Sequence, residues 1–543
     1  MKFRIYFLAS IFVFILMPVY AQEEEPQTDF FEVFENETIF IEIDEKTILF
    51  PEPDEDSTAD IALADAVFII NSFTFNIKGI TRPYALINAG ELIKGEEIKG
   101  FNSLEFYIQD KTQILFNERV LDNVSIDYTI GEAGHDGKYP VDLVINTTDT
   151  WNIIAIPRPQ YSSSSGFDVT IKARDYNFLG TMYPLRVDLG YSYDEEGNTT
   201  FHMMIDSGIP FRLFDLNWHF DFDHYFDYRP DTEEPYYYRN DTGLSVELPV
   251  GFTTLKLGFD ESLIYNLENS DSDKPKYGNF QEGPFLRSNP YLSWKIPTGV
   301  EVGNFGELSY TPRASATFNH EISGYPLADF RTEPSLSFGH SLSFGRIDWI
   351  GNFRKGLSAN FSNSYSYSFF NQKNDKRALD TSINLRGIGH LTFNDMFGIS
   401  GRVIYRHWFF DDYTDKGGDV LRGIIDKEVS ANNMLSMNLD LNIRLYKVRP
   451  SIWFEEPKMR IFDFDFHVVP IFDAAFYRSH KIEEKYGDYD FTMKNMLVTA
   501  GLEVVLFPIF FRSLFLRASL GINLSTLLNT SRYELFIGTE FHY

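Results

Sequence analysis

The chain has 543 residues and a net charge of -30, from 48 basic and 78 acidic side chains, and it contains no cysteine. The negative charge argues against nucleic acid as a partner, and the lack of cysteine excludes disulfides, thiol chemistry and cysteine-ligated metals. Aromatic residues make up 17% of the chain, yet its mean hydropathy is only -0.22. This combination favours an all-β transmembrane barrel, whose strands turn only half of their residues toward lipid.

The N-terminus has the pattern of a secretory signal peptide. Lys2 and Arg4 precede an apolar run at 5–17, and the small residue Ala21 ends the segment. We therefore expect residues 1–21 to be removed and the mature chain to begin near Gln22. No later apolar run reaches the roughly 20 residues that a membrane-spanning helix needs. The absence of a stop-transfer segment predicts export beyond the inner membrane.

Residues 22–69 are strongly acidic, with runs at 23–25 and 54–56 and a single lysine, Lys46. Such a composition predicts a largely disordered periplasmic segment. A docking arm for a basic partner is the alternative interpretation.

Residues 70–151 change to the pattern of a compact α/β module. Pro83 opens the first helix and Gly90 ends it, while Ser103 is expected to cap the second helix. The expected elements are a strand at 73–78, helices at 83–89 and 104–121, and a hairpin of strands at 124–128 and 141–145. This β-α-α-β-β order resembles a POTRA domain, a periplasmic module that binds polypeptide by strand addition at a sheet edge. A single copy is present, and we expect it to fold as a soluble domain.

Residues 152–543 read as strands joined by alternately short and long connections, as in an outer-membrane barrel. Short connections are expected at 177–182, 207–210, 249–252 and 507–508, and long ones at 221–240, 268–282, 411–433 and 479–490. About eighteen strand patterns can be counted. We expect about sixteen antiparallel strands, because some patterns between 283 and 370 are interpreted as insertions or split strands, with eighteen as the alternative.

The long segment 411–433 carries Leu421-Arg422-Gly423-Ile424 near its tip. The strand after it alternates without exception between apolar residues at 435–445 and polar residues at 436–444. This alternation turns Asp440 into the lumen, and the next strand turns Asp473 inward as well. Two lumen carboxylates without a cation would repel each other. We therefore predict that Arg422 folds back into the lumen beside Asp440 and Asp473, whereas the plainer reading is an arginine in solvent.

The chain ends on a strand with an aromatic carboxy terminus. Gly538, Phe541 and Tyr543 have the Gly-x-x-aromatic-x-aromatic spacing of a barrel-assembly signal. This spacing predicts that the protein is itself a substrate of outer-membrane assembly.

Together, these features resemble the BamA/TamA-type outer-membrane assembly and translocation superfamily (the bacterial surface antigen family), over about residues 70–543. Leu421-Arg422-Gly423-Ile424 is similar to the family's Val-Arg-Gly-Phe/Tyr motif, with Ile424 replacing the aromatic. Asn177-Phe178-Leu179-Gly180 is similar to a family turn after the second strand. Ile471-Phe472-Asp473-Ala474-Ala475 is similar to Phe-x-Asp-x-Gly, with Ala475 replacing glycine.

The resemblance implies an assembly or translocation factor of the bacterial outer membrane, with its N-terminal domain in the periplasm. The first and last strands would meet at a seam that opens sideways, where a client strand pairs with the exposed edge. Pro157 and Pro159 in the first strand would weaken this seam, because proline has no backbone N–H to donate. The implied partners are outer-membrane lipid, an unfolded or nascent polypeptide client and a periplasmic accessory protein.

Two alternatives remain at this point. A passive porin or receptor-type barrel explains the strands and the terminal signal, but not the POTRA-like module. An enzyme would need a nucleophile and a base. The nearest cluster, at 218–225, reads as a strand end with solvated acids or as a weak Ca²⁺ site, so we expect no enzymatic activity, no cofactor and no metal.

Overall fold

The computed structural model describes residues 66–543 apart from several gaps. The gaps are residues 136, 163–165, 194–197, 231–235, 267–283, 323–324, 328, 375, 410–414, 417–419, 425–429, 479–495, 513, 526–532 and 539–543. The predicted signal peptide (1–21) and almost all of the acidic segment (22–69) lie outside the described residues, and so do Phe541 and Tyr543 of the terminal signal.

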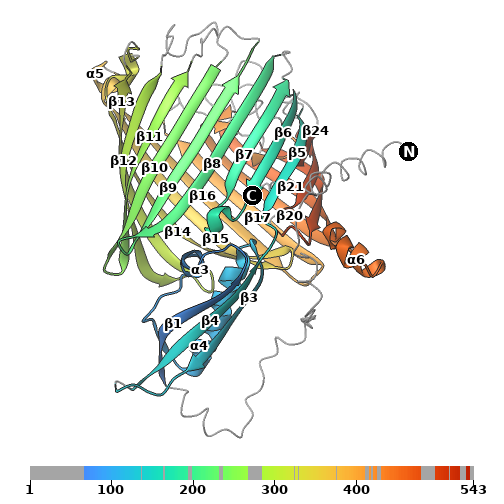
Figure 1. The fold of residues 1–543 in the computed structure, drawn as a ribbon. Coiled ribbons are helices and arrows are strands. Elements are labelled where there is room, and N and C mark those ends of the chain that lie inside the picture. Colours follow the sequence, from blue (N-terminus) through green and yellow to red (C-terminus); the bar gives the residue numbers. More distant parts are fainter. Residues whose placement is uncertain are drawn as a thin grey trace, which may run out of the picture. The chain divides into compact units, whose positions relative to one another are not determined.

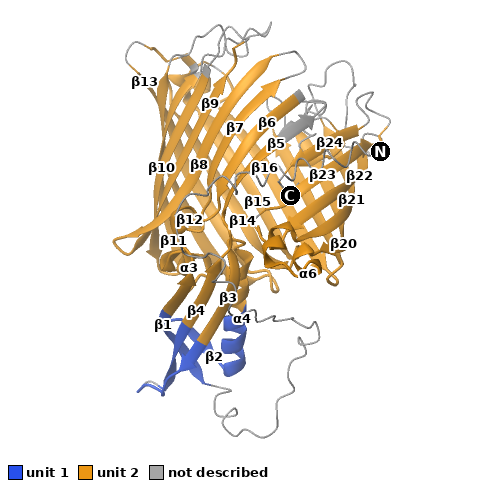
Figure 2. Cartoon of the chain, turned by 45° about the vertical axis from the view of Figure 1, so that its right-hand side comes forward, with its two compact units in different colours: residues 1–73, 93–109, 128–143 blue, residues 74–92, 110–127, 144–543 orange. Residues whose placement is uncertain are grey.

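The chain forms two compact units, which Figure 2 distinguishes by colour. Unit 1 comprises residues 1–73, 93–109 and 128–143, and unit 2 comprises residues 74–92, 110–127 and 144–543. Some N-terminal strands and helices contribute residues to both units. The domain boundary expected near residue 151 therefore stays a prediction.

The N-terminal elements form a small α/β fold with a four-stranded sheet of order β2-β1-β4-β3. Its elements, labelled in Figure 1, are β1 (Val67–Lys78), α3 (Pro83–Ala89), β2 (Glu97–Lys99), α4 (Phe101–Asn117), β3 (Leu121–Ile130) and β4 (Lys138–Asp149). Each predicted strand and helix has a counterpart, although the bounds of most differ, and β2 is an addition that the sequence pattern did not reveal. The long strand β3 lies at one edge of the sheet, and the short strand β2 lies at the other.

The first helix begins and ends as predicted, but the second does not. Pro83 stands in the first turn of α3 after the extended residue Arg82, and Gly90 caps the end. The predicted helix 104–121 is wrong at both ends, since α4 starts at Phe101, directly after Gly100. Ser103 therefore lies within the first turn and is not the cap.

The remaining chain forms a closed barrel of 18 antiparallel strands among the described residues. The strands are β5 (Ile153–Ser162), β6 (Gly166–Asp175), β7 (Leu185–Tyr193), β8 (Thr199–Leu213), β9 (Leu216–Tyr228), β10 (Tyr236–Val250), β11 (Thr253–Asn266), β12 (Phe285–Glu301), β13 (Glu307–Glu321), β14 (Ser335–Ile350), β15 (Phe353–Ser368), β16 (Leu379–Thr392), β17 (Phe397–Trp408), β20 (Asn433–Val448), β21 (Phe464–Arg478), β22 (Leu497–Pro508), β23 (Leu516–Asn523) and β24 (Tyr533–Gly538).

The preferred number of sixteen strands is wrong, and the alternative of eighteen is confirmed. The patterns between 283 and 370 are not insertions, because β12 to β15 pair along most of their lengths. Each neighbour is the next barrel strand in sequence, and the last strand, β24, closes on the first, β5. Figure 1 shows the strands as tilted neighbours around the barrel.

Side chains alternate between an apolar outer face and a polar lumen, as the period-two pattern predicts. On β20, Met437, Leu439 and Leu441 are exposed on the outside, while Asn438 and Asp440 are buried in the lumen. The outer face of the barrel therefore has the chemistry of a lipid-facing wall. Within the described residues, no helix combines the length and the apolar character needed to cross a membrane.

The connections divide the barrel into a short-turn end and a long-loop end. Two short connections and one long connection were misplaced or overestimated in the sequence analysis. Residues 507–508 are the last two of β22, and the connection to β23 follows them. Residues 207–210 lie inside β8, and the turn follows at Phe214 and Asp215. The predicted loop 221–240 shrinks to 229–235, because alternating acids such as Asp221 and Asp223 belong to β9 and are not loop residues.

The smaller elements lie in the connections between barrel strands. They are η2 (Phe178–Gly180), η3 (Asp329–Arg331), α5 (Phe369–Lys373), β18 (Asp415–Lys416), β19 (Ser430–Ala431), α6 (Pro450–Trp453) and η6 (Pro457–Phe462). The pair β18–β19 forms a two-stranded sheet in the long connection between β17 and β20, which carries Arg422.

A matched pair of substitutions on β14 tests the assignment of the two faces. Leu342 is exposed on the outer face, whereas its neighbour Ser341 faces the lumen. We expect Leu342→Arg to lower the free energy of unfolding in lipid vesicles by roughly 2–4 kcal/mol, as a cation at the bilayer midplane does. Ser341→Arg should change it little. Equal effects of the two substitutions in a urea titration would contradict the assignment.

Candidate functional site

The segment Val420-Leu421-Arg422-Gly423-Ile424 lies inside the barrel lumen. The Arg422 side chain is only 5% exposed, which confirms that it is not an arginine in solvent. Its carboxylate partners project from successive strands of the barrel wall, namely β20, β21 and β22. The barrel therefore presents acidic groups from several strands to one loop side chain.

The guanidinium of Arg422 donates to three carboxylates. Nη2 lies 2.6 Å from Asp440 Oδ1 and 2.6 Å from Asp473 Oδ1, and Nε lies 3.0 Å from Asp473 Oδ2. Nη1 lies 3.1 Å from Glu503 Oε1. The backbone N–H of Arg422 also donates to Asp473 Oδ2 at 2.8 Å. Asp473 is completely buried, and it accepts hydrogen bonds from both the backbone and the side chain of Arg422.

These contacts keep the arginine charged. Burial by itself lowers the pKa of Arg422, but its hydrogen bonds to Asp473 and the charges of Asp440, Asp473 and Glu503 outweigh this effect, so that its pKa lies above the ordinary value. Arginine presents a rigid, planar fork of donors that suits several carboxylates at once. Arg422 therefore stays protonated at physiological pH.

Gly423 brings the loop backbone into contact with the barrel wall. Its φ of 102° favours glycine, and its N–H donates to Glu534 Oε2 of β24 at 2.8 Å. A Cβ on Gly521 of β23 would lie 2.5 Å from Gly423 N and 2.6 Å from Arg422 C. Glycine is thus required on both sides of this contact.

Apolar side chains seat the same loop on either side of the arginine. Leu421 and Ile424 are both buried in one cluster with Val420, and the cluster includes Ala475. The other members are Ile404, Ala431, Met434, Tyr477 and Leu497. Ile424 and Ala475, the two residues that differ from the motifs named above, therefore belong to the same buried apolar cluster. With these two residues in place, the loop remains packed against the barrel wall.

The loop carbonyl of Val420 is held as well. Asn438 Nδ2 donates to it at 2.8 Å, and Arg402 Nη2 approaches it at 3.4 Å. Arg402 Nε also donates to Asn438 Oδ1 at 2.8 Å, so that β17 joins β20 in holding the loop.

The network continues from the loop toward the first barrel strand. Glu503 accepts from Arg517 of β23 at 3.2 Å, and the Arg517 guanidinium lies 4.4 Å from the centre of the Phe536 ring on β24. On the other side, the guanidinium of Arg158 on β5 lies 5.4 Å from the same ring. Phe536 thus connects the last strand to the first on the lumen side. Gly538 lies beside this contact, since a Cβ there would meet Arg158 Nη2 at 2.7 Å.

The two prolines of β5 face the seam. The Asn152 carbonyl accepts from Tyr176, which follows β6, so the even-numbered residues of β5 direct their backbone groups to β6. By alternation, Pro157 and Pro159 direct theirs to β24. Because proline has no N–H, neither residue can donate a hydrogen bond across the seam.

The predicted turn motif lies apart from the Arg422 network, in the connection after β6. Asn177 is completely buried. Its Nδ2 donates to Thr81 Oγ1 at 2.7 Å and to Asp149 Oδ2 at 3.2 Å, and its Oδ1 accepts from Met182 N at 2.9 Å. This asparagine therefore joins three segments of unit 2.

The residues after Asn177 form η2. Gly180 has a φ of 73°, and a Cβ there would lie 2.0 Å from the Ile80 carbonyl oxygen. Its own carbonyl accepts from Arg82 N at 2.9 Å. Phe178 and Leu179 complete the turn, with Leu179 half exposed. We interpret this motif as a structural junction and not as part of the loop site.

Sequence reasoning identified Asp440 and Asp473 but missed other residues of the site, four of them near the carboxy terminus. Glu503, Arg517, Gly521 and Glu534 come from the last three strands. Glu503 could have been found from the sequence, because it is the only charged residue of its strand and the alternation turns it toward the lumen. The contact of Gly521 with the loop has no signal in the local sequence.

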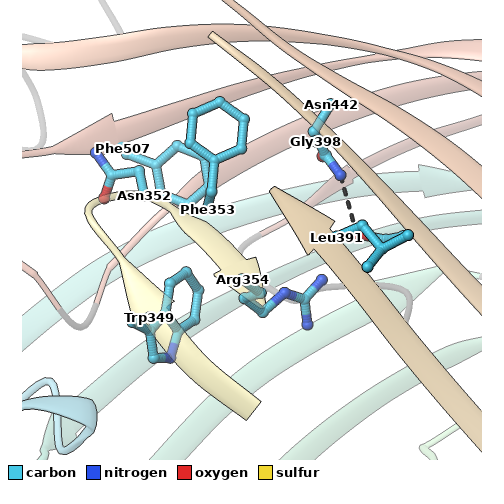
Figure 3. A pocket seen from close by; sticks show the side chains of 9 residues that line it. Trp349, Asn352, Phe353, Arg354, Leu391, Gly398, Asn442 and Phe507 are labelled. Atoms are coloured by element: carbon cyan, nitrogen blue, oxygen red, sulfur yellow. Dashed lines mark hydrogen bonds between the residues drawn. The ribbon is translucent and has the colours of Figure 1, made fainter. Parts of the chain in front are cut away.

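Figure 3 shows a separate small pocket near the short-turn end, formed by β14, β15, β16, β17, β20 and β22. Its lining residues are Trp349, Asn352, Phe353, Arg354, Leu391, Gly398, Ser400, Asn442 and Phe507. Asn442 donates to Ser400 at 3.0 Å, and Ser400 also contacts His390 at 2.8 Å. These polar groups therefore bond to one another.

The acid- and histidine-containing segment 218–225 lies within β9 and does not end a strand, contrary to the prediction. His219 Nε2 lies 2.9 Å from Asp221 Oδ1. Among the residues that the structure describes, no group of three or more His, Asp or Glu is placed to hold a metal ion.

No family model matches the chain, and no curated protein matches it. Solved structures do resemble it. CdiB from Acinetobacter baumannii is 12% identical, with 87% of this chain and 73% of that chain covered, at a TM-score of 0.46. BamA from Haemophilus ducreyi lacking POTRA domains 1-3 is also 12% identical, with 87% and 84% covered, at 0.39. CdiB from Escherichia coli is 10% identical, with 91% and 93% covered, at 0.40.

Removing the arginine tests its role in holding the loop. Arg422→Ala leaves three buried carboxylates without their common cation, so we expect a loss of roughly 3–5 kcal/mol in the free energy of unfolding. Asp473→Ala should cost a similar amount, and the double variant much less than the sum. Urea unfolding and heat-dependent gel mobility measure this. Arg386→Ala, an exposed lumen arginine on β16, is the control, and additive losses would contradict a shared interaction.

Adding one methyl group to the wall tests the backbone contact without changing any charge. Gly521→Ala places a carbon too close to the backbone of Arg422 and Gly423, so the loop must shift. We expect protease cleavage within 417–429 to accelerate at least several-fold. Gly387→Ala on β16, where no atom lies within 4 Å of the added carbon, is the matched control. Equal cleavage rates in both variants would show that the loop is not seated on Gly521.

Proposed function

We propose that this protein is an outer-membrane factor that assembles or translocates polypeptides without a chemical step. The observation that carries the proposal is the Arg422 network, in which one lumen loop holds strands that lead to the β24–β5 seam. A passive channel needs no such connection. The apolar outer face supports a membrane location, and the α/β fold would then lie in the periplasm.

The seam is the proposed place of action. Pro157 and Pro159 remove two donors that β5 would otherwise offer to β24, so this junction is weaker than an ordinary pair of barrel strands. The Arg158–Phe536–Arg517 contacts hold it from the lumen side. Because this junction depends on few backbone hydrogen bonds and on these side-chain contacts, it can open without disturbing the rest of the barrel.

The proposed client is an unfolded or nascent polypeptide that forms strands. An opened β24 or β5 would expose backbone N–H and C=O groups, which pair with an incoming strand as sheet edges do. The edge strand β3 of the α/β fold offers a second place for strand addition. A periplasmic accessory protein would deliver the client there.

The proposal is tested by closing the seam with a reversible crosslink. Because the natural chain has no cysteine, Arg158→Cys together with Phe536→Cys gives one defined pair for a short disulfide-containing crosslinker. With the barrel in lipid vesicles, a urea-denatured outer-membrane polypeptide is added and its membrane insertion is followed. We expect the crosslink to abolish the acceleration of insertion over empty vesicles, and reduction to restore it.

The matched control joins two strands away from the seam. Ser364→Cys with Ser382→Cys, whose native hydroxyl oxygens lie 2.7 Å apart on β15 and β16, should leave the acceleration unchanged. A passive porin or receptor gives a different result. It would not accelerate insertion, and any solute flux through it would be the same with the seam open or crosslinked.

A further inference from the structure

One connection at the short-turn end differs from its neighbours. The strands β8 and β9 are joined by two residues, as are β10 and β11, whereas residues 449–463 join β20 to β21 through α6 and η6. Figure 1 and Figure 2 show α6 outside the barrel wall, beside the ends of β20 and β21. We call residues 449–463 the rim lobe.

The rim lobe has a defined conformation. Asp463 is buried, and its carboxylate accepts from both the backbone N–H and the hydroxyl of Ser451. Arg449 ties the lobe to β21, because its Nη1 donates to the Phe464 carbonyl at 2.8 Å and its Nη2 to Asp465 Oδ1 at 2.5 Å. Side chains on the lobe are therefore presented in fixed positions and are not carried by a loose loop.

Three consecutive apolar residues of the rim lobe are exposed on the surface of the protein. Ile452 is 63% exposed, Trp453 is 61% exposed and Phe454 is 69% exposed. A soluble surface rarely gathers large apolar side chains in this way, since each costs free energy in water. This group therefore calls for a non-aqueous contact.

The apolar outer wall of the barrel extends to the end of β20 that leads into the rim lobe. A bulge between Arg444 and Tyr446 turns Tyr446 outward next to Leu445, and both are exposed. The Tyr446 ring lies 6.5 Å from that of Phe466, which is its partner on β21. The apolar outer face of β20 and β21 thus extends to the rim, where the lobe begins.

The charges of the rim lobe do not favour one sign of partner. Glu455 and Glu456 are exposed, and so are Lys458 and Arg460. Net charge is therefore not the main contribution to the binding of a partner by the rim lobe. Tryptophan and tyrosine are enriched where a protein meets the headgroup region, because their rings have apolar bodies and polar tips.

We infer that the rim lobe binds the lipid surface at the short-turn end, with Ile452, Trp453 and Phe454 in the boundary between headgroups and acyl chains. This inference rests on the membrane location stated under the proposed function. The lobe anchors β20 and β21, the strands that carry Asp440 and Asp473. It thereby holds the two principal partners of Arg422 at a fixed depth in the bilayer.

The test uses the full chain in vesicles of phosphatidylethanolamine and phosphatidylglycerol. Trp453→Cys carries the single nitroxide label, and its collision rates with oxygen and with a water-soluble nickel chelate are measured. Leu441→Cys on the outer wall and Arg386→Cys in the lumen are the controls. We expect the label at 453 to have a several-fold lower nickel collision rate than the one at 386, with high oxygen collision, as at 441.

The outcomes separate the inference from the proposed membrane location. If the label at 441 meets lipid and the label at 453 meets nickel as freely as the one at 386, the rim lobe is in water and the inference is overturned. If the label at 453 is shielded from both reagents, protein covers the lobe, as a second copy or a periplasmic partner, and lipid contact is again overturned. If the label at 441 is itself in water, the membrane location fails.

Discussion

A buried positive charge among buried negative charges governs the loop site of this barrel. Arg422 meets Asp440, Asp473 and Glu503 at 2.6 to 3.1 Å, in a part of the lumen that solvent hardly reaches. None of these groups could be removed singly at low cost, because each would leave an unpaired charge in a poorly solvated place. The loop and the strands on which it sits are therefore one electrostatic unit.

Close packing adds a second constraint to the charge. Hydrogen bonds from an arginine tolerate small shifts, but the contact between the backbones at Gly423 and Gly521 does not. Leu421 and Ile424 fill the apolar space on either side. Ion pairs alone would allow the loop to shift along the barrel wall, whereas the backbone contact and the apolar packing fix it in one position. A loop in a fixed position can influence strands that it does not touch.

The sequence was sufficient to predict a barrel and two of the carboxylates that hold the loop, but not the number of strands. Period-two alternation is a local property, so it placed Asp440 and Asp473 in the lumen without knowledge of the fold. It could not place Glu503, Arg517 or Glu534 beside them, because their meeting depends on how far successive strands are staggered. The strand count failed for a related reason: β12 to β15 have mixed, serine-rich patterns, which read as insertions until their pairing is seen.

The partners of the loop are also ordered along the chain in a way that bears on how the barrel comes together. Arg422 and Gly423 meet residues 18, 51, 81 and 111 positions further on, one each on β20, β21, β22 and β24. Such contacts close relatively short stretches of chain, whereas joining Arg158 to Phe536 must close nearly the whole barrel. The carboxy-terminal third can therefore assemble around its own loop first, and the ring is completed last at its weakest junction.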